Sequence, residues 1–147
     1  MSVSIFDSFL TSTEMIAAFD EAAIVQAMFR FEAALARAQA EEGLIPAAAA
    51  SAIAGVCNAQ LYDIPALIHA GRRAGSLAIP LVKELTKTVA LYDEGAARHA
   101  HWGSTSQDVI DTAMVLVTRE ALQLLDDGLH ELCAHLLALA DTHLATP

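Results

Sequence analysis

Apolar residues recur at helical spacing along most of the chain. A first short helix is predicted from Ser12 or Thr13, and a longer one covers residues 20–42. Gly43 stands where a helix commonly ends in a left-handed residue. The apolar positions of the longer helix follow steps of three and four: Ile24, Met28, Phe31, Leu35 and Ala38.

Shorter helices are predicted between this segment and residue 95. Pro46 suits the first turn of a helix that continues to about Cys57, and residues 62–71 form another. Residues 71–75 begin and end with glycine and predict a loop. Pro80 opens a further helix that ends within residues 92–95 and whose apolar side comprises Leu81, Val82, Leu85, Val89 and Leu91.

One long helix is predicted from Ser106 to about His143. Only Gly128 interrupts the pattern, so the helix has about 38 residues and a length of roughly 57 Å. Its apolar stripe is wider than one neighbouring helix covers, which is typical of a multi-helix bundle. The remaining segments are too short to cover it, so further helices from other copies or from additional sequence are needed.

Composition narrows the class to an all-α protein that binds neither nucleic acid nor membrane. Hydrophobic residues make up 55% of the chain but aromatic residues only 5%, a balance that favours helices. The net charge is −10 and no basic stripe appears, so binding to phosphate backbones or anionic membranes lacks an electrostatic basis. The N-terminal sequence does not resemble a signal peptide and no segment resembles a membrane span, which predicts a cytoplasmic protein.

The polar string Thr105-Ser106-Gln107-Asp108 precedes the long helix and matches the capping-box pattern. One interpretation is purely structural, with Thr105 capping the helix and Asp108 reaching back to it. The other is functional, because hydroxyls and free N–H groups at a helix start bind carboxylates. His101, two residues before Gly103, could donate a hydrogen bond to the same anion or transfer a proton. No metal site is predicted, since His99 and His101 lack a third ligand nearby.

The segment His101-Trp-Gly-Ser-Thr-Ser-Gln-Asp108 resembles the first signature of the fumarase/aspartase superfamily, H-x-G-x-T-S-x-D. Residues 31–39, 43–46 and 74–83 resemble, in order and spacing, the 3-carboxy-cis,cis-muconate cycloisomerase family within it. Adenylosuccinate lyases are similar around the same motif but usually carry a His-Asp pair where this chain has Ile79–Val82. The absence of this His-Asp pair favours a resemblance to the cycloisomerase family over one to the adenylosuccinate lyases.

The resemblance implies an all-α fold in which residues 1–104 form a small N-terminal helical domain. Residues 105–147 would then begin the first long helix of the central bundle. It also implies that Thr105, Ser106, Gln107 and Asp108 bind the substrate, a di- or tricarboxylate, and that His101 and Ser106 take part in catalysis. The implied reaction is the cofactor-independent lactonisation of a muconate in the β-ketoadipate pathway of aromatic degradation, performed by a homotetramer.

Two later signatures of the superfamily, G-R-T-x-x-Q and S-S-x-M-P-x-K-x-N, do not occur in the chain. We therefore expect the sequence to be the N-terminal third of such an enzyme and to be inactive alone. Two alternatives stay open: a lyase that eliminates fumarate, as adenylosuccinate lyase does, and a non-enzymatic helical oligomerisation module whose polar string is only a cap.

Overall fold

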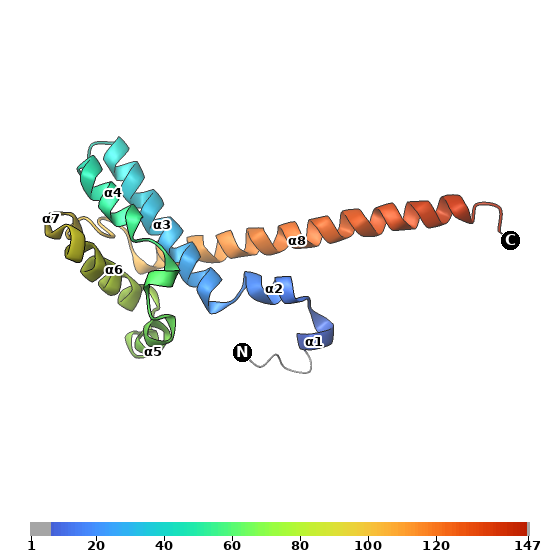
Figure 1. Cartoon of the computed structure of the whole chain (residues 1–147), viewed down its shortest axis with the longest axis horizontal. Coiled ribbons are helices and arrows are strands. Elements are labelled where there is room, and N and C mark those ends of the chain that lie inside the picture. The colour runs from blue at the N-terminus through green and yellow to red at the C-terminus, as the bar shows by residue number, and fades with distance from the viewer. Residues whose placement is uncertain (1–6, 147) are drawn as a thin grey trace.

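The computed structural model describes residues 7–146, and these residues form helices joined by short loops (Figure 1). The described part of the chain contains no strand, which confirms the all-α prediction. The elements in chain order are α1 (Asp7–Leu10), α2 (Thr13–Ala18), α3 (Glu21–Glu41), α4 (Ala47–Gly55), the 3₁₀ turn η1 (Ala59–Leu61), α5 (Ile64–Ala74), α6 (Ala78–Tyr92), α7 (Glu94–Ala97) and α8 (Ser106–Thr142).

Helix α3 is the central element of the compact part of the molecule. Asp20 caps it, since its carboxylate accepts a hydrogen bond from the N–H of Ala23 at 2.7 Å. The helix packs against α4 along one side and against the start of α8 along another. Its buried face includes Val25, Met28, Phe29, Glu32, Ala33, Ala36 and Gln39.

The predicted stripe of α3 is wrong by about one residue position. Met28 is buried as predicted, but Ile24, Phe31 and Leu35 are only partly buried and Ala38 is exposed. The helix packs on two neighbours, so the buried arc includes small and polar side chains that a search for large apolar residues passes over.

The remaining core comes from α4, α6 and the first half of α8. Ile53 from α4, Leu81, Leu85 and Val89 from α6, and Val109 from α8 are all fully inaccessible to solvent. Burial of this apolar surface is the main favourable term that holds the short helices together.

Three predicted helix boundaries differ from the structure. Residues 71–74 belong to α5 and not to a loop, and Gly75 alone takes the left-handed conformation that ends the helix, at φ 75°. Helix α6 begins at Ala78, two residues before Pro80, because proline is tolerated in a first turn. Pro46 is the N-cap of α4 and does not lie in its first turn.

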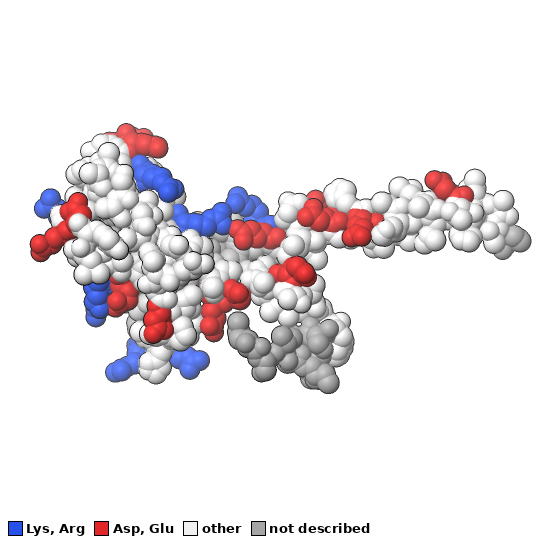
Figure 2. Space-filling model, viewed as in Figure 1, with Lys and Arg blue, Asp and Glu red and all other residues white. Residues whose placement is uncertain are grey.

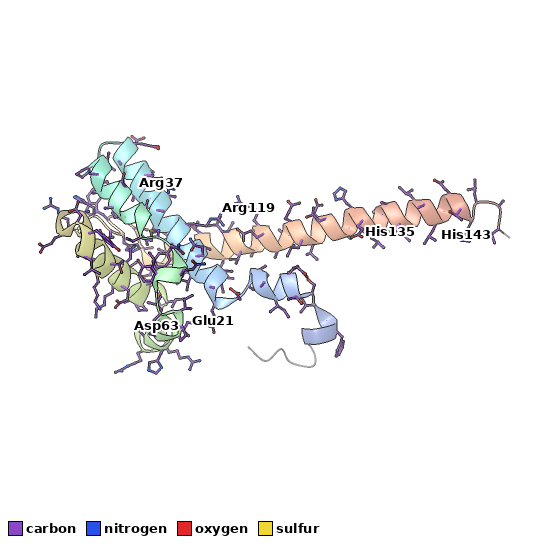
Figure 3. The ribbon with its side chains drawn as sticks, in the orientation of Figure 1. Glu21, Arg37, Asp63, Arg119, His135 and His143 are labelled. Carbon is purple, nitrogen blue, oxygen red and sulfur yellow. The ribbon has the colours of Figure 1, made fainter. Side chains whose placement is uncertain are left out.

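Helix α8 is continuous through Gly128, as predicted, and has two contrasting halves. Val109, Ala113, Val117 and Ala121 are buried against the other helices. From residue 122 to residue 146 every side chain is exposed, and this part projects from the rest of the molecule (Figures 1 and 3).

The projecting part carries few charges, and most of its surface in Figure 2 is white. It displays a row of leucines that are each more than half exposed: Leu122, Leu125, Leu129, Leu132, Leu136, Leu137 and Leu139. The chain therefore does not cover its own long helix, as the sequence predicts. The division into domains at residue 104 stays a prediction. Within residues 7–146, no helix is both long and apolar enough to cross a bilayer.

We expect Leu85→Ala to lower the free energy of unfolding by about 2–5 kcal/mol, because the side chain is fully buried and its removal leaves a cavity. Leu91→Ala on the same helix is the matched control. Its side chain is 83% exposed, so a change within about 0.5 kcal/mol is expected. Urea denaturation followed by circular dichroism measures both, and equal effects would contradict this description of the core.

Candidate functional site

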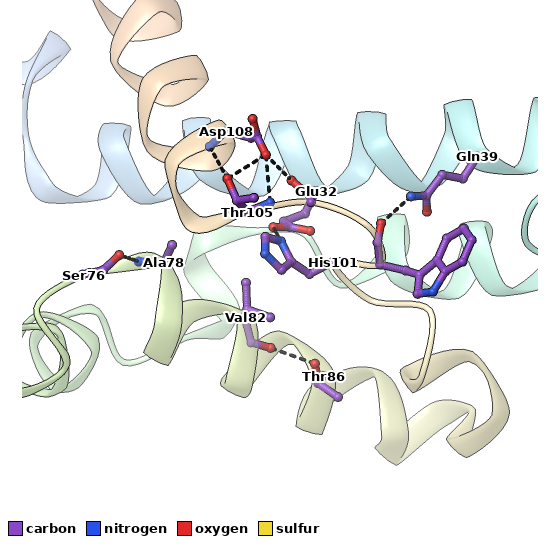
Figure 4. Close-up of polar contacts among 11 residues, drawn as sticks. Glu32, Gln39, Ser76, Ala78, Val82, Thr86, His101, Thr105 and Asp108 are labelled. Carbon is purple, nitrogen blue, oxygen red and sulfur yellow. Dashed lines mark hydrogen bonds and ion pairs between the residues drawn. The ribbon is translucent and has the colours of Figure 1, made fainter.

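The capping box predicted at the start of α8 is present. The N–H and the hydroxyl of Thr105 both donate to one carboxylate oxygen of Asp108 at 2.8 Å, and the hydroxyl of Ser104 donates to the same oxygen at 3.3 Å. The N–H of Asp108 in turn donates to the Thr105 hydroxyl oxygen at 3.4 Å. Figure 4 shows this network, in which Asp108 Oδ2 accepts hydrogen bonds from three donors.

This network decides which donors at the helix start stay free. The Thr105 hydroxyl and N–H both serve Asp108, so they are not available to a ligand in this arrangement. The Ser106 hydroxyl has no hydrogen-bond partner among residues 7–146. The N–H groups of Ser106 and Gln107 lie in the first turn, where no intrahelical acceptor exists. The donors that are free to hydrogen-bond an anion are therefore the Ser106 hydroxyl and the N–H groups of Ser106 and Gln107.

The other predicted site residues are placed as follows. Gln107 lies on the same turn, but its side-chain amide donates to Asp111 at 2.6 Å. His101 lies in the loop before the helix, near Thr105 and Asp108 (Figure 4). His99 is half-buried, and among the described residues no group of three or more His, Cys, Asp or Glu side chains lies close enough together to hold a metal ion.

The loop that carries His101 is fastened to α3 by a buried carboxylate. Nδ1 of His101 lies 2.7 Å from Oε1 of Glu32, whose side chain is fully buried while that of His101 is 16% exposed. His101 has φ 57°, a left-handed conformation that costs a non-glycine residue roughly 1–2 kcal/mol. The contact with Glu32 offsets this cost and sets the direction of the ring.

A second contact from the same face of α3 holds the next residue of the loop. The side-chain amide of Gln39 donates to the carbonyl oxygen of Trp102 at 2.6 Å. Gln39 and Glu32 are seven residues apart, which is two helical turns, so both face the loop. Gly103 then takes φ 72°, which favours glycine.

Electrostatics distinguish His101 from Asp108. The hydrogen bond to Glu32 raises the pKa of His101 above its ordinary value, burial opposes this, and the charges of Glu32 and Asp108 add to the rise. Hydrogen bonds from the N–H and hydroxyl of Thr105 lower the pKa of Asp108. The site therefore pairs an imidazole that favours its protonated form with a carboxylate that favours its ionised form.

Glu32 and Gln39 are functional candidates that the sequence interpretation missed. Both are polar residues at buried positions of α3, with exposures of 1% and 8%. Lysine, arginine and glutamate are almost never fully buried without a partner. A polar residue that continues the Val25, Phe29 and Ala36 face of an otherwise apolar helix is the signal that finds them.

The family follows from comparison with known proteins. A family model described as "Lyase" matches residues 9–147. The chain belongs to this lyase family. The enzyme 3-carboxy-cis,cis-muconate cycloisomerase of Bradyrhizobium diazoefficiens is 52% identical over 134 residues, covering 91% of this chain and 30% of that protein. Nitrosuccinate lyase of Streptomyces davaonensis is 44% identical, covering 92% of this chain and 28% of that protein.

Solved structures of the lyase family share the fold. The crystal structure of β-carboxy-cis,cis-muconate cycloisomerase from Acinetobacter calcoaceticus superposes with a TM-score of 0.88 at 38% identity, covering 95% of this chain and 33% of that one. The resemblance to fumarase/aspartase-superfamily cycloisomerases is thereby confirmed. The chain spans about 30% of the length of the relatives it matches.

The raised pKa of His101 makes folding stability depend on pH. Because the folded-state pKa lies above the ordinary value of 6.5, the stability gained from the Glu32 contact is fully present below pH 6.5. It is lost as the pH rises through the folded-state pKa. We expect the free energy of unfolding to fall over this range in the wild type and to fall less in His101→Asn, in which asparagine tolerates the left-handed backbone.

Urea titrations between about pH 6 and about pH 9 measure this difference. His69→Asn is the matched control, since His69 is exposed on α5. Equal pH dependence in the wild type and in His101→Asn would show that the contact with Glu32 does not raise the pKa of His101.

Proposed function

We propose that the start of α8 and His101 together bind a carboxylate of a tricarboxylate substrate. They form one wall of the active site of a 3-carboxy-cis,cis-muconate cycloisomerase. The observation that carries this proposal is that free donors in the first turn of α8 lie near an imidazole that is mostly buried and held by Glu32. Donors at a helix N-terminus stabilise carboxylates, and a protonated imidazole adds a charged hydrogen bond.

The substrate class follows from similarity and from charge. The 52% identity to a muconate cycloisomerase favours a substrate with three carboxylates. The chain as a whole carries a net charge of −10, so only local donors and His101 offset the repulsion of such an anion. Ser106 and His101 are the proposed catalytic residues, and Thr105, Gln107 and Asp108 shape the site.

The proposed reaction depends mainly on holding the reacting groups of the substrate in position. One carboxylate oxygen of the muconate adds to a carbon of a double bond in the same molecule, and the neighbouring carbon takes up a proton. Holding another carboxylate fixed places the reacting oxygen near its target, and fixed donors offset charge where it gathers. No metal or organic cofactor is required for this addition.

A groove elsewhere on the molecule does not fit the same ligand. The groove between α5 and α6 has a volume of about 460 Å³ and its lining includes Tyr62, Asp63, Glu84 and Thr88. Two carboxylates in its wall repel a tricarboxylate. The helix start at Ser106 is therefore the better candidate.

The assembly that we propose is a cytoplasmic homotetramer, as the family resemblance implies. The leucine row on the projecting half of α8 would be covered by bundle helices, and the other walls of the site would come from segments beyond those in this chain. Residues 1–147 alone are accordingly expected to show no lactonising activity.

We expect Ser106→Ala in the complete gene product to reduce kcat/KM by about tenfold to a hundredfold, the value of a hydrogen bond to a charged group. Thr105→Ala is expected to reduce it similarly, since loss of the cap releases Asp108. Loss of a cap alone costs about 1 kcal/mol of stability.

Asp63→Ala is the control for both variants. Asp63 caps α5 by accepting a hydrogen bond from the N–H of Ala66 at 3.0 Å, away from the site. Its loss is expected to cost similar stability and to leave turnover unchanged. If all three variants lose activity in proportion to stability, the cap is only structural. That result would favour the hypothesis of a non-enzymatic helical oligomerisation module.

A spectrophotometric assay of the complete gene product with two substrates tests the reaction itself. Lactonisation of 3-carboxy-cis,cis-muconate is expected, with no fumarate released from adenylosuccinate. The second activity without the first would favour the eliminating lyase, and measurable lactonisation by residues 1–147 alone would contradict the proposed division of the active site.

A further inference from the structure

The side chain of Glu32 is a buried titratable group with a single partner. Its Oε1 lies 2.7 Å from Nδ1 of His101, whereas Oε2 is buried without any hydrogen bond from residues 7–146. A buried carboxylate in an ordinary structural role usually has its oxygens satisfied. The free-energy cost of burying the Glu32 carboxylate is therefore offset by a single donor, the His101 ring.

The contact fixes which ring nitrogen faces away from α3. An ionised carboxylate only accepts hydrogen bonds, so Nδ1 of His101 carries a proton in both charge states of the ring. Nε2 is the remaining nitrogen. Turning the ring over would leave Glu32 buried and unpaired, which is strongly unfavourable. Gln39 holds the carbonyl of Trp102, so the backbone next to His101 is also fixed.

We propose that Glu32 is a positioning residue that holds His101 as an imidazolium, with its Nε2–H directed to a ligand carboxylate at the first turn of α8. The proposal rests on the proposed function, because it assigns the carboxylate site there. It makes His101 a charged donor to the ligand. A general base would instead require the neutral ring, with a lone pair on Nε2.

Charge at the site explains why an imidazolium is needed. The charged groups acting on His101 are Glu32 from α3 and Asp108 from α8, both of which favour its protonation. The charge of Glu32 also acts on the thiol of Cys57, whose pKa burial raises to about 12. A carboxylate bound beside Ser106 meets the negative charge of Asp108, and the positive charge of His101 offsets it.

The first test follows His101 directly in the 147-residue chain by ¹⁵N NMR of its imidazole. The wild type is expected to show a protonated Nδ1 throughout and to lose the Nε2 proton at a higher pH than an ordinary imidazole does. Glu32→Gln keeps an oxygen that accepts from Nδ1 but removes the charge. Its titration midpoint is expected to move to lower pH.

Glu41→Gln is the matched control, because it removes the same charge from an exposed position at the end of α3. Its His101 midpoint is expected to equal that of the wild type. An unchanged midpoint in Glu32→Gln, or a wild-type ring protonated only on Nε2 when neutral, would overturn the proposal whether or not any ligand binds.

The second test measures binding of tricarballylate, an unreactive tricarboxylate, to the complete gene product by calorimetry across the same pH range. Binding to the wild type is expected to weaken as His101 loses its proton. Glu32→Gln is expected to lose affinity at lower pH and to bind about tenfold more weakly near neutral pH, while Glu41→Gln binds normally.

The outcomes separate this inference from the proposed function. If tricarballylate binds and its pH profile does not move in Glu32→Gln although the NMR midpoint does, the carboxylate site stands and the role of Nε2 is overturned. If the wild type does not bind it, the carboxylate site fails and the ligand role of His101 with it. Should Glu32→Gln fail to fold, His101→Asn replaces it. Its binding of tricarballylate is expected to be weak and to lack the pH dependence that His101 gives the wild type, and wild-type affinity or an unchanged pH profile would overturn the proposal.

Discussion

The contact between Glu32 and His101 is the interaction on which the rest of the site depends. It joins the middle of α3 to a loop 69 residues later in the chain, and it does so inside the protein, where a carboxylate without a partner is very unfavourable. The loop therefore has one favourable position against α3. That position determines where the loop ends, where α8 begins and how the capping residues are presented.

Helix α8 shows how one element serves stability and function at different points along its length. Its first turns are capped, buried on one side and adjacent to His101, so their free N–H groups are held in a fixed place. Its last 21 helical residues, 122–142, are all exposed and display leucines to solvent. The helix thus links a capped end, which we propose binds an anion, to a surface that further bundle helices would cover.

The sequence predicted those features that depend on local spacing. The capping box requires only Thr105 and Asp108 three residues apart, and the long helix requires only an unbroken apolar pattern, so both were confirmed. The resemblance to the superfamily was confirmed by the comparisons. Predicted boundaries failed where the local signal was ambiguous. Glycine at position 71 does not form a turn but lies inside α5, where a Cβ would come within 3.3 Å of the Cα of Leu77.

Features that depend on distant residues were not predicted. Nothing near His101 in the sequence indicates that it takes a left-handed conformation or that its partner lies on α3. The predicted stripe of α3 followed large apolar side chains and so excluded Glu32 and Gln39, although both continue its buried face. The capping-box pattern also did not show that the two hydroxyls differ. The Thr105 hydroxyl donates to Asp108, whereas the Ser106 hydroxyl is free within residues 7–146.

A crystal structure of the complete gene product with tricarballylate bound would show directly whether Glu32 and His101 build a carboxylate site. One ligand carboxylate is expected within about 3 Å of Ser106 Oγ and of His101 Nε2, with Nδ1 still paired to Glu32. A ligand bound away from the first turn of α8, or a His101 ring turned so that Nδ1 leaves Glu32, would contradict it.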